Sequence, residues 1–106
     1  MTVRGREGEA VAEEGRALGR KADAVTLDIT DPDSGAAAVE SAVRSFGGLD
    51  VLVNNAFRDG NRKTFEESTL KEWKGTMDVN LWGTLQMTAA AVPAMKERGG
   101  GHIVMI

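Results

Sequence analysis

Three segments of the chain carry apolar residues at the spacing of a helix. In residues 7–18 the apolar positions recur every three or four residues, and Gly19 follows as a helix stop. A second helix is predicted at residues 36–46, where alanines dominate and two glycines follow. Asp31 suits its N-cap and Pro32 its first helical position. These local signals make the second helix the best-bounded element of the chain.

The third helix begins at a capping box. Thr69 and Glu72 have the spacing at which each side chain bonds the backbone amide of the other residue. The helix can run from there to about Arg98. Gly75 and Gly83 are the positions near which we expect it to break, because glycine is a poor helix former.

Short apolar runs between the helices predict strands at residues 24–28, 49–53 and 102–106. The run 49–53 has β-branched residues without polar alternation, as in a parallel strand covered on both faces. Helix and strand alternate, and their connections are too long for hairpins. We therefore predict an α/β fold with a parallel sheet and right-handed crossovers.

Polar residues end two of these predicted strands. Asp28 closes the first, and Asn54 and Asn55 follow the second. In parallel α/β sheets, ligands bind beyond the carboxyl ends of the strands, near the point where the strand order reverses. Position alone therefore nominates these three residues as a ligand site.

Composition excludes several classes of function. The net charge of −3 leaves no basic surplus for a nucleic-acid partner, and no stretch approaches the roughly 20 apolar residues of a membrane span. The chain has no cysteine and one histidine, which excludes thiolate chemistry and a multi-histidine metal site. We therefore expect no resident metal. We also expect a cytoplasmic protein, because no apolar signal-peptide core is visible.

Three motifs now stand in order at familiar separations. They are Leu-Asp-Ile-Thr-Asp at residues 27–31, Leu-Asp-Val-Leu-Val-Asn-Asn-Ala at 49–56 and Asp-Val-Asn-Leu-Trp-Gly at 78–83. Together they resemble the short-chain dehydrogenase/reductase family, and residues 93–95 and 100–104 continue the resemblance over nearly the whole chain. The Asn-Asn-Ala element is its most specific part.

The resemblance implies a fold and a domain. Residues 1–106 are expected to be a partial NAD(P)-binding domain, part of a Rossmann-like doubly wound parallel sheet without its first strand and C-terminal part. In the family's strand order of 3-2-1-4-5 the first strand lies between the second and the fourth. We expect unpaired strand edges and a truncated reading frame.

The resemblance also implies a role for each motif residue. Asp28 is expected to accept a hydrogen bond from the adenine amino group, and Ile29 to contact the adenine. The backbone of Asn54 approaches the cofactor ribose, while the side chain of Asn55 braces the sheet. Asn80 matches a member of the catalytic tetrad, whose helix break exposes a carbonyl that holds a proton-relay water.

Further positions matching the family line the cofactor, namely Ala56, Val79 and Ile106. Arg4 and Arg6 follow the end of the preceding strand, where a cation can meet a 2′-phosphate, which favours NADP over NAD. Each position keeps a plainer interpretation. The aspartate can cap a loop, the asparagine pair can form a type I turn, Asn80 can be merely solvated, and surface arginine is common.

One residue departs from the family pattern. Phe57 replaces the glycine that usually follows Asn-Asn-Ala, which removes φ freedom and adds a ring near the nicotinamide side. The aromatic and methionine residues of the third helix are expected in the core or at a subunit contact; they are Trp73, Met77, Trp82, Met87 and Met95.

By resemblance, the full-length protein transfers hydride between NAD(P) and a small carbonyl or alcohol substrate, and associates into homo-oligomers through the helix at 69–98. The family's glycine-rich loop, serine, tyrosine and lysine are not found here, and the chain contains no tyrosine. We therefore expect an inactive fragment. The alternative is a non-catalytic nucleotide-binding or regulatory module of the same fold. A flavodoxin-like receiver is disfavoured, because the acidic pair and late lysine that it requires are missing.

Overall fold

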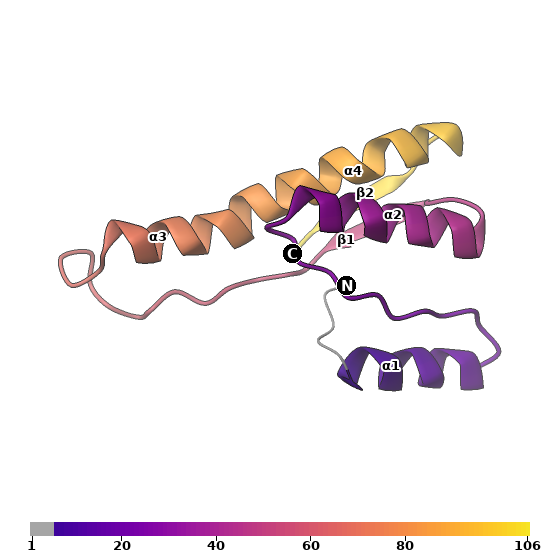
Figure 1. The fold of residues 1–106 in the computed structure, drawn as a ribbon, viewed down its shortest axis with the longest axis horizontal. Coiled ribbons are helices and arrows are strands. Elements are labelled where there is room, and N and C mark those ends of the chain that lie inside the picture. The colour runs from indigo at the N-terminus through magenta and orange to yellow at the C-terminus, as the bar shows by residue number, and fades with distance from the viewer. Residues whose placement is uncertain (1–5) are drawn as a thin grey trace.

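The computed structural model describes residues 6–106, which form helices and one small parallel sheet (Figure 1). The elements in chain order are α1 (Arg6–Ala17), α2 (Pro32–Phe46), β1 (Val51–Asn54), α3 (Leu70–Met77), the π-helical segment η1 (Asp78–Gly83), α4 (Thr84–Glu97) and β2 (His102–Met105). Helices α3 and α4 are joined through η1 without a loop, so the crossover between the strands is one long interrupted helix.

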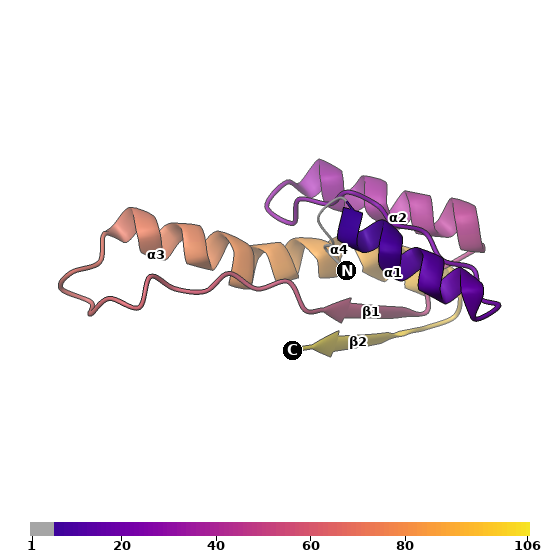
Figure 2. The ribbon, with the colours of Figure 1, turned by 90° about the horizontal axis from the view of Figure 1, so that it is seen from below.

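The two strands are parallel, as the alternation of helix and strand predicted. Val51 pairs with His102 and Asn54 with Met105, so the ladder is in register along both strands. Helices α2 and α4 pack against each other and lie on the same side of the two strands (Figure 2). The carboxyl ends of both strands point to the same edge, which is where ligands of such folds bind.

The predicted helix ends are confirmed. The Asp31 side chain caps α2 by accepting a hydrogen bond from the Asp33 amide, and Gly47 ends the helix with a left-handed φ of 88°. The capping box of Thr69 and Glu72 is present with both of its bonds. The predicted break lies at η1, whose last residue is Gly83. Short-range hydrogen bonding therefore decides where these helices begin, end and change pitch.

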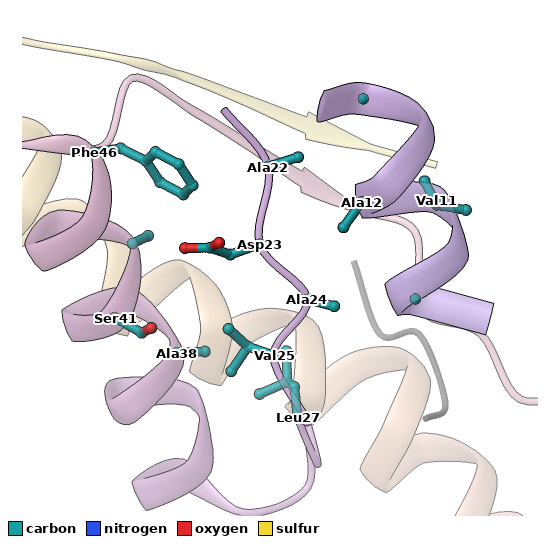
Figure 3. A pocket seen from close by; sticks show the side chains of 13 residues that line it. Val11, Ala12, Ala22, Asp23, Ala24, Val25, Leu27, Ala38, Ser41 and Phe46 are labelled. Atoms are coloured by element: carbon teal, nitrogen blue, oxygen red, sulfur yellow. The ribbon is translucent and has the colours of Figure 1, made fainter. Parts of the chain in front are cut away.

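The predicted strand at residues 24–28 is wrong for the described part of the chain, where residues 20–28 have no regular structure. The segment runs between α1 and α2 (Figure 1). Its side chains alternate as in a strand, with Ala22 and Ala24 turned toward α1, and Val25 and Leu27 toward α2 (Figure 3). A strand needs a neighbour for its ladder hydrogen bonds, and no described residue supplies one.

The prediction that both faces of the strand at 49–53 are covered is also wrong. Val51 and Val53 are 53% and 44% exposed, whereas Leu52 and Asn54 are half-buried. All residues of β2 are exposed. Successive side chains of a strand point to opposite faces, and α2 and α4 lie on only one side of the sheet.

A small core lies between α2 and α4. Met87, Ala91 and Met95 of α4 are buried at the spacing of one helix face, and Met87 packs close to Gly35 of α2. Met87 and Met95 are thus core residues as predicted. Trp73, Met77 and Trp82 are 44% to 57% exposed, so they are not in the core of this chain. No helix of the described residues combines the length and apolarity needed to cross a membrane.

Candidate functional site

An open cleft of about 1230 Å³ lies at the carboxyl-end edge of the sheet. It collects residues from the turn that precedes α2, from the segment that follows β1, and from η1. Its lining consists of Leu27, Asp28, Ile29, Thr30, Asn55, Ala56, Phe57, Arg58, Asp59 and Val79. Five of the residues nominated from the sequence meet here, although they come from three separate parts of the chain.

Asp28 opens a tight turn and is itself oriented by that turn. Its Oδ1 accepts hydrogen bonds from the Thr30 hydroxyl at 2.7 Å and the Thr30 amide at 2.9 Å. These two bonds hold the pKa of the Asp28 carboxyl below its ordinary value, so the group is ionised at neutral pH. Among the described residues, no donor reaches its Oδ2. Asp28 therefore caps the turn and presents a free acceptor to the cleft.

Ile29 follows Asp28 and anchors the turn from the inside. Its side chain is buried, and it rests against Gly83, where an added Cβ would come within 2.6 Å of the Ile29 Cδ1. Its carbonyl accepts a hydrogen bond of 3.2 Å from the Gln86 Nε2. The turn beside the cleft is thus fixed to the junction of η1 and α4.

Asn54, the last residue of β1, and Asn55, which follows it, have different roles from those predicted. The Asn54 Nδ2 donates to the Thr88 hydroxyl at 3.3 Å, and its carbonyl accepts from the Ile106 amide at 3.1 Å. Asn54 is therefore the residue whose side chain braces the sheet to α4, while Asn55 lines the cleft. Only one strand face is covered by α4, and Asn54 is on it.

Asn80 lies in the middle of η1 and holds the segment after β1. Its Oδ1 accepts from the Arg58 amide at 2.8 Å and its Nδ2 donates to the Arg58 carbonyl at 3.0 Å. The Asn80 carbonyl accepts from the Thr84 hydroxyl at 3.2 Å. The side chain is therefore not merely solvated: its amide acts as a backbone substitute that pairs with Arg58 as a neighbouring strand would.

Phe57 introduces an exposed ring into the cleft without backbone strain. The ring is 71% exposed, and Arg62 is the one non-glycine residue with positive φ in the described chain. The freedom that a glycine would offer at position 57 is therefore not needed for this path of the backbone.

Of the nominated residues whose side chains the structure describes, Asn54, Asn80 and Ile106 are not among those that line the cleft. Ile106 follows β2 and is 84% exposed. Arg4 lies outside the described residues, and the side chain of Arg6, the first residue of α1, is likewise not described. Asn54 lines a narrow cavity of about 30 Å³ beside the cleft, together with Ile29 and Gly83.

Several residues that shape the site were missed from the sequence. The role of the Thr30 amide has a detectable signal in Asp28, since an aspartate side chain often accepts a hydrogen bond from the backbone amide two residues later. Gln86 carries none, because its partner Ile29 is 57 residues away. Arg58 takes part through its backbone, which leaves no trace in the residue type.

A second hollow, of about 400 Å³, lies between α1, the segment 22–27 and α2 (Figure 3). Small apolar side chains dominate its lining, and Asp23 is its one charged residue. None of the nominated residues that the structure describes in full lies there. Among residues 6–106 no group of three or more His, Cys, Asp or Glu side chains could hold a metal ion. The cleft beside Asp28 is thus the better candidate site.

Comparison with known proteins gives matches over nearly the whole chain. A family model described as short chain dehydrogenase matches residues 1–106. The 3-alpha-(or 20-beta)-hydroxysteroid dehydrogenase of Mycobacterium tuberculosis is 47% identical over 105 residues, which cover 93% of this chain and 39% of that protein. The chain therefore spans well under half the length of this relative.

Solved structures match to a similar extent. A 3-ketoacyl-ACP reductase from Sinorhizobium meliloti 1021 superposes with a TM-score of 0.89 at 38% identity, covering 93% of this chain and 39% of that one. A 7 alpha-hydroxysteroid dehydrogenase complexed with NADH and 7-oxo glycochenodeoxycholic acid gives a TM-score of 0.85 at 29% identity, covering 93% and 38%.

Proposed function

Because the chain belongs to the short-chain dehydrogenase family, we propose that it is part of an oxidoreductase that transfers hydride between a nicotinamide coenzyme and a carbonyl or alcohol carbon. The family match confirms the resemblance drawn from the sequence, and the solved structures confirm the α/β class with part of a Rossmann-like parallel sheet. The observation that carries the proposal is the meeting of Asp28, Asn55 and Val79 in one cleft at the carboxyl ends of the strands.

The cleft fits the adenosine part of such a coenzyme. Asp28 offers an ionised acceptor suited to an exocyclic amine, and Ile29 and Val79 offer apolar contacts for a ring. We assign Asn54 and Ala56 to the ribose side, and Ile106 to the same binding region. When bound, the coenzyme supplies the hydride donor or acceptor; the residues of this chain bind and orient it.

Asn80 has a positioning and proton-holding part in this proposal. Its amide fixes the backbone of Arg58 at the rim of the cleft, and its own carbonyl lies in the π-helical segment. We assign that carbonyl to the water that relays protons. The chain contains no tyrosine, so the phenol that donates the proton in the family is not among its residues, and we propose that the chain by itself is inactive.

The choice of coenzyme rests on the sequence. Arg4 and Arg6 favour NADP, since a guanidinium binds a 2′-phosphate well, and NAD is the other candidate. The 7 alpha-hydroxysteroid dehydrogenase above was solved with NADH, and hydroxysteroid and ketoacyl substrates occur among the similar proteins. We propose a small carbonyl or alcohol substrate of this broad kind, in the cytoplasm, without a nucleic-acid or membrane partner.

We also propose a homo-oligomer formed through the long interrupted helix. Its exposed large apolar side chains are distributed over α3, η1 and α4; they are Leu70, Trp73, Met77, Leu81, Trp82 and Leu85. Large apolar side chains gathered in this way favour burial against a partner.

The alternative is a non-catalytic nucleotide-binding or regulatory module of the same fold, whose complete gene product would lack the family's tyrosine and lysine. The test is to sequence the locus on both sides, express the complete gene product, and follow absorbance of the reduced coenzyme with a panel of ketosteroids, cyclic ketones and ketoacyl thioesters. Coenzyme oxidation supports the dehydrogenase. Coenzyme binding without turnover, in a product lacking the family's tyrosine and lysine, supports the module, and no binding at all excludes both.

A further inference from the structure

We propose that Gln86 is a positioning residue that sets the direction of the Asp28 carboxylate, and thereby recognition of the adenine amino group, through the Ile29–Thr30 peptide. The inference rests on the proposed function, because it concerns how the same cleft selects its coenzyme. Gln86 is half-buried on α4 and lies outside the cleft lining, so it is proposed to act through its neighbours and not by direct contact.

The turn that carries Asp28 has one peptide held at both ends. The Asp31 amide donates to the Asp28 carbonyl at 3.1 Å, which makes Ile29 and Thr30 the central residues of a four-residue turn. The carbonyl of the peptide between them accepts from the Gln86 Nε2 at 3.2 Å. The amide of that same peptide donates to the Asp28 Oδ1 at 2.9 Å.

Because a peptide unit is planar, these two hydrogen bonds are mechanically linked. The two common turn types differ mainly in the direction of this central peptide, and the β-branched Thr30 opposes the positive φ of the flipped type, so the movement open to the peptide is a tilt. The Gln86 amide holds the carbonyl toward α4, and the N–H therefore points back toward Asp28. Loss of this donor frees the peptide to tilt, and the Asp28 carboxylate loses one of the two donors that orient it.

The two flanks of the turn are held by contacts of their own. The Ile29 side chain is buried against Gly83, and the Asp28 amide donates to the Ser34 hydroxyl at 3.0 Å. The two flanks of the turn are thus held by packing and by α2. Between these flanks, the hydrogen bond from Gln86 holds the orientation of the central peptide.

The test compares coenzymes that differ only at the adenine amino group. The complete gene product is titrated with whichever of NADH and NADPH binds it more tightly, and with its purine counterpart, in which a hydrogen atom replaces the amine. The ratio of the two dissociation constants measures recognition of the amine by Asp28. One charge-assisted hydrogen bond corresponds to a preference of roughly tenfold for the adenine form.

Gln86→Leu removes the donor and Gln86→Glu replaces it with an ionised acceptor of the same length. We expect both to reduce the preference by roughly fivefold. In an Asp28→Ala background, Gln86→Leu should leave the ratio unchanged, because its effect passes through that carboxylate. Lys96→Leu, a similar change at an exposed position of α4, is the matched control and should keep the ratio.

Each outcome decides between the claims. If the unsubstituted product binds no nicotinamide coenzyme, the proposed function fails and the inference fails with it. Binding with a preference that Gln86→Leu and Gln86→Glu leave intact overturns the inference alone. Equal weakening of both coenzymes, with a lower unfolding temperature, also overturns it, because Gln86 would then be a structural residue only. The inference is established if the Gln86 substitutions weaken binding of the adenine coenzyme alone, and if Gln86→Leu has no such effect in the Asp28→Ala background.

Discussion

Arg98 and Asp50 form a two-pronged ion pair that joins the end of α4 to the start of β1. The Arg98 Nε donates to the Asp50 Oδ1 at 3.1 Å, and its Nη2 donates to Oδ2 at 3.2 Å. The arginine stem lies over Gly48, where an added Cβ would overlap it. The hydrogen bonds to Asp50, and the charge of its carboxylate, raise the pKa of Arg98. The pair thus helps to set the register between the crossover helix and β1, the strand that precedes it.

Replacing Arg98 by Lys should lower the unfolding temperature slightly, since lysine cannot make both bonds at once. Both side chains are about half exposed, so the loss should be small and should shrink further in high salt. Thermal unfolding at low and high salt measures this. Gly48→Ala should have a similar effect by displacing the arginine, and a salt-independent loss in Arg98→Lys would argue against the ion pair.

Glu72 predicts a dependence of stability on pH. The Lys63 ammonium, and then the Thr69 amide, lower the pKa of Glu72 from its ordinary 4.5 to about 2. Because the folded pKa is lower than the unfolded one, the stabilisation is fully present above pH 4.5 and is lost as pH falls toward about 2. In Glu72→Gln, the urea concentration at the unfolding midpoint should depend less on pH over this window. Glu66→Gln, at a neighbouring exposed glutamate, is the control and should keep the slope.

Gly83→Ala should destabilise the protein and disturb the cleft together. The new Cβ would lie 2.6 Å from the Ile29 Cδ1, so Ile29 must move, at a cost of about 1–3 kcal/mol. Urea unfolding measures the loss, and coenzyme affinity should fall with it because Ile29 lines the cleft. Gly60→Ala is the matched control, since its Cβ meets open space and its φ is not positive. Equal effects of the two changes would contradict this packing argument.

Asn80→Leu should release the segment after β1. It removes both partners of the Arg58 backbone, which costs about 1–2 kcal/mol. Hydrogen exchange at the Arg58 amide should become faster, and turnover of the complete gene product should fall more than its coenzyme affinity. Asn80→Asp keeps the acceptor for the Arg58 amide and should preserve that protection. Unchanged exchange in Asn80→Leu would mean that the segment is held by other contacts.

Asp28→Asn should separate the two tasks of the aspartate. The amide oxygen can still accept from Thr30, so the turn and the unfolding temperature should change little. The group facing the cleft becomes a donor, which opposes an amine, and coenzyme affinity should fall roughly tenfold. Isothermal titration measures the affinity. Asp33→Asn, in the first turn of α2, serves as the control for loss of one negative charge.

The sequence by itself determined the elements whose signals are local. Asp31, Gly47 and the box of Thr69 and Glu72 act through hydrogen bonds within a few residues, and so the helix ends were predictable. Asn55 was also predictable as a cleft residue, because it follows β1 at the carboxyl edge of a parallel sheet, whereas Val79 was predicted only through the resemblance to the family.

Only the tertiary structure decided the contacts between distant segments. The pairing of Asn80 with the Arg58 backbone spans 22 residues, and that of Gln86 with Ile29 spans 57. It also decided that Asn54, and not Asn55, braces the sheet, and that residues 24–28 form no strand in the described chain. The physical reason is common to these cases. A ladder, a covered face or a hydrogen bond to a backbone carbonyl depends on what lies opposite, and the residue type carries no record of its partner.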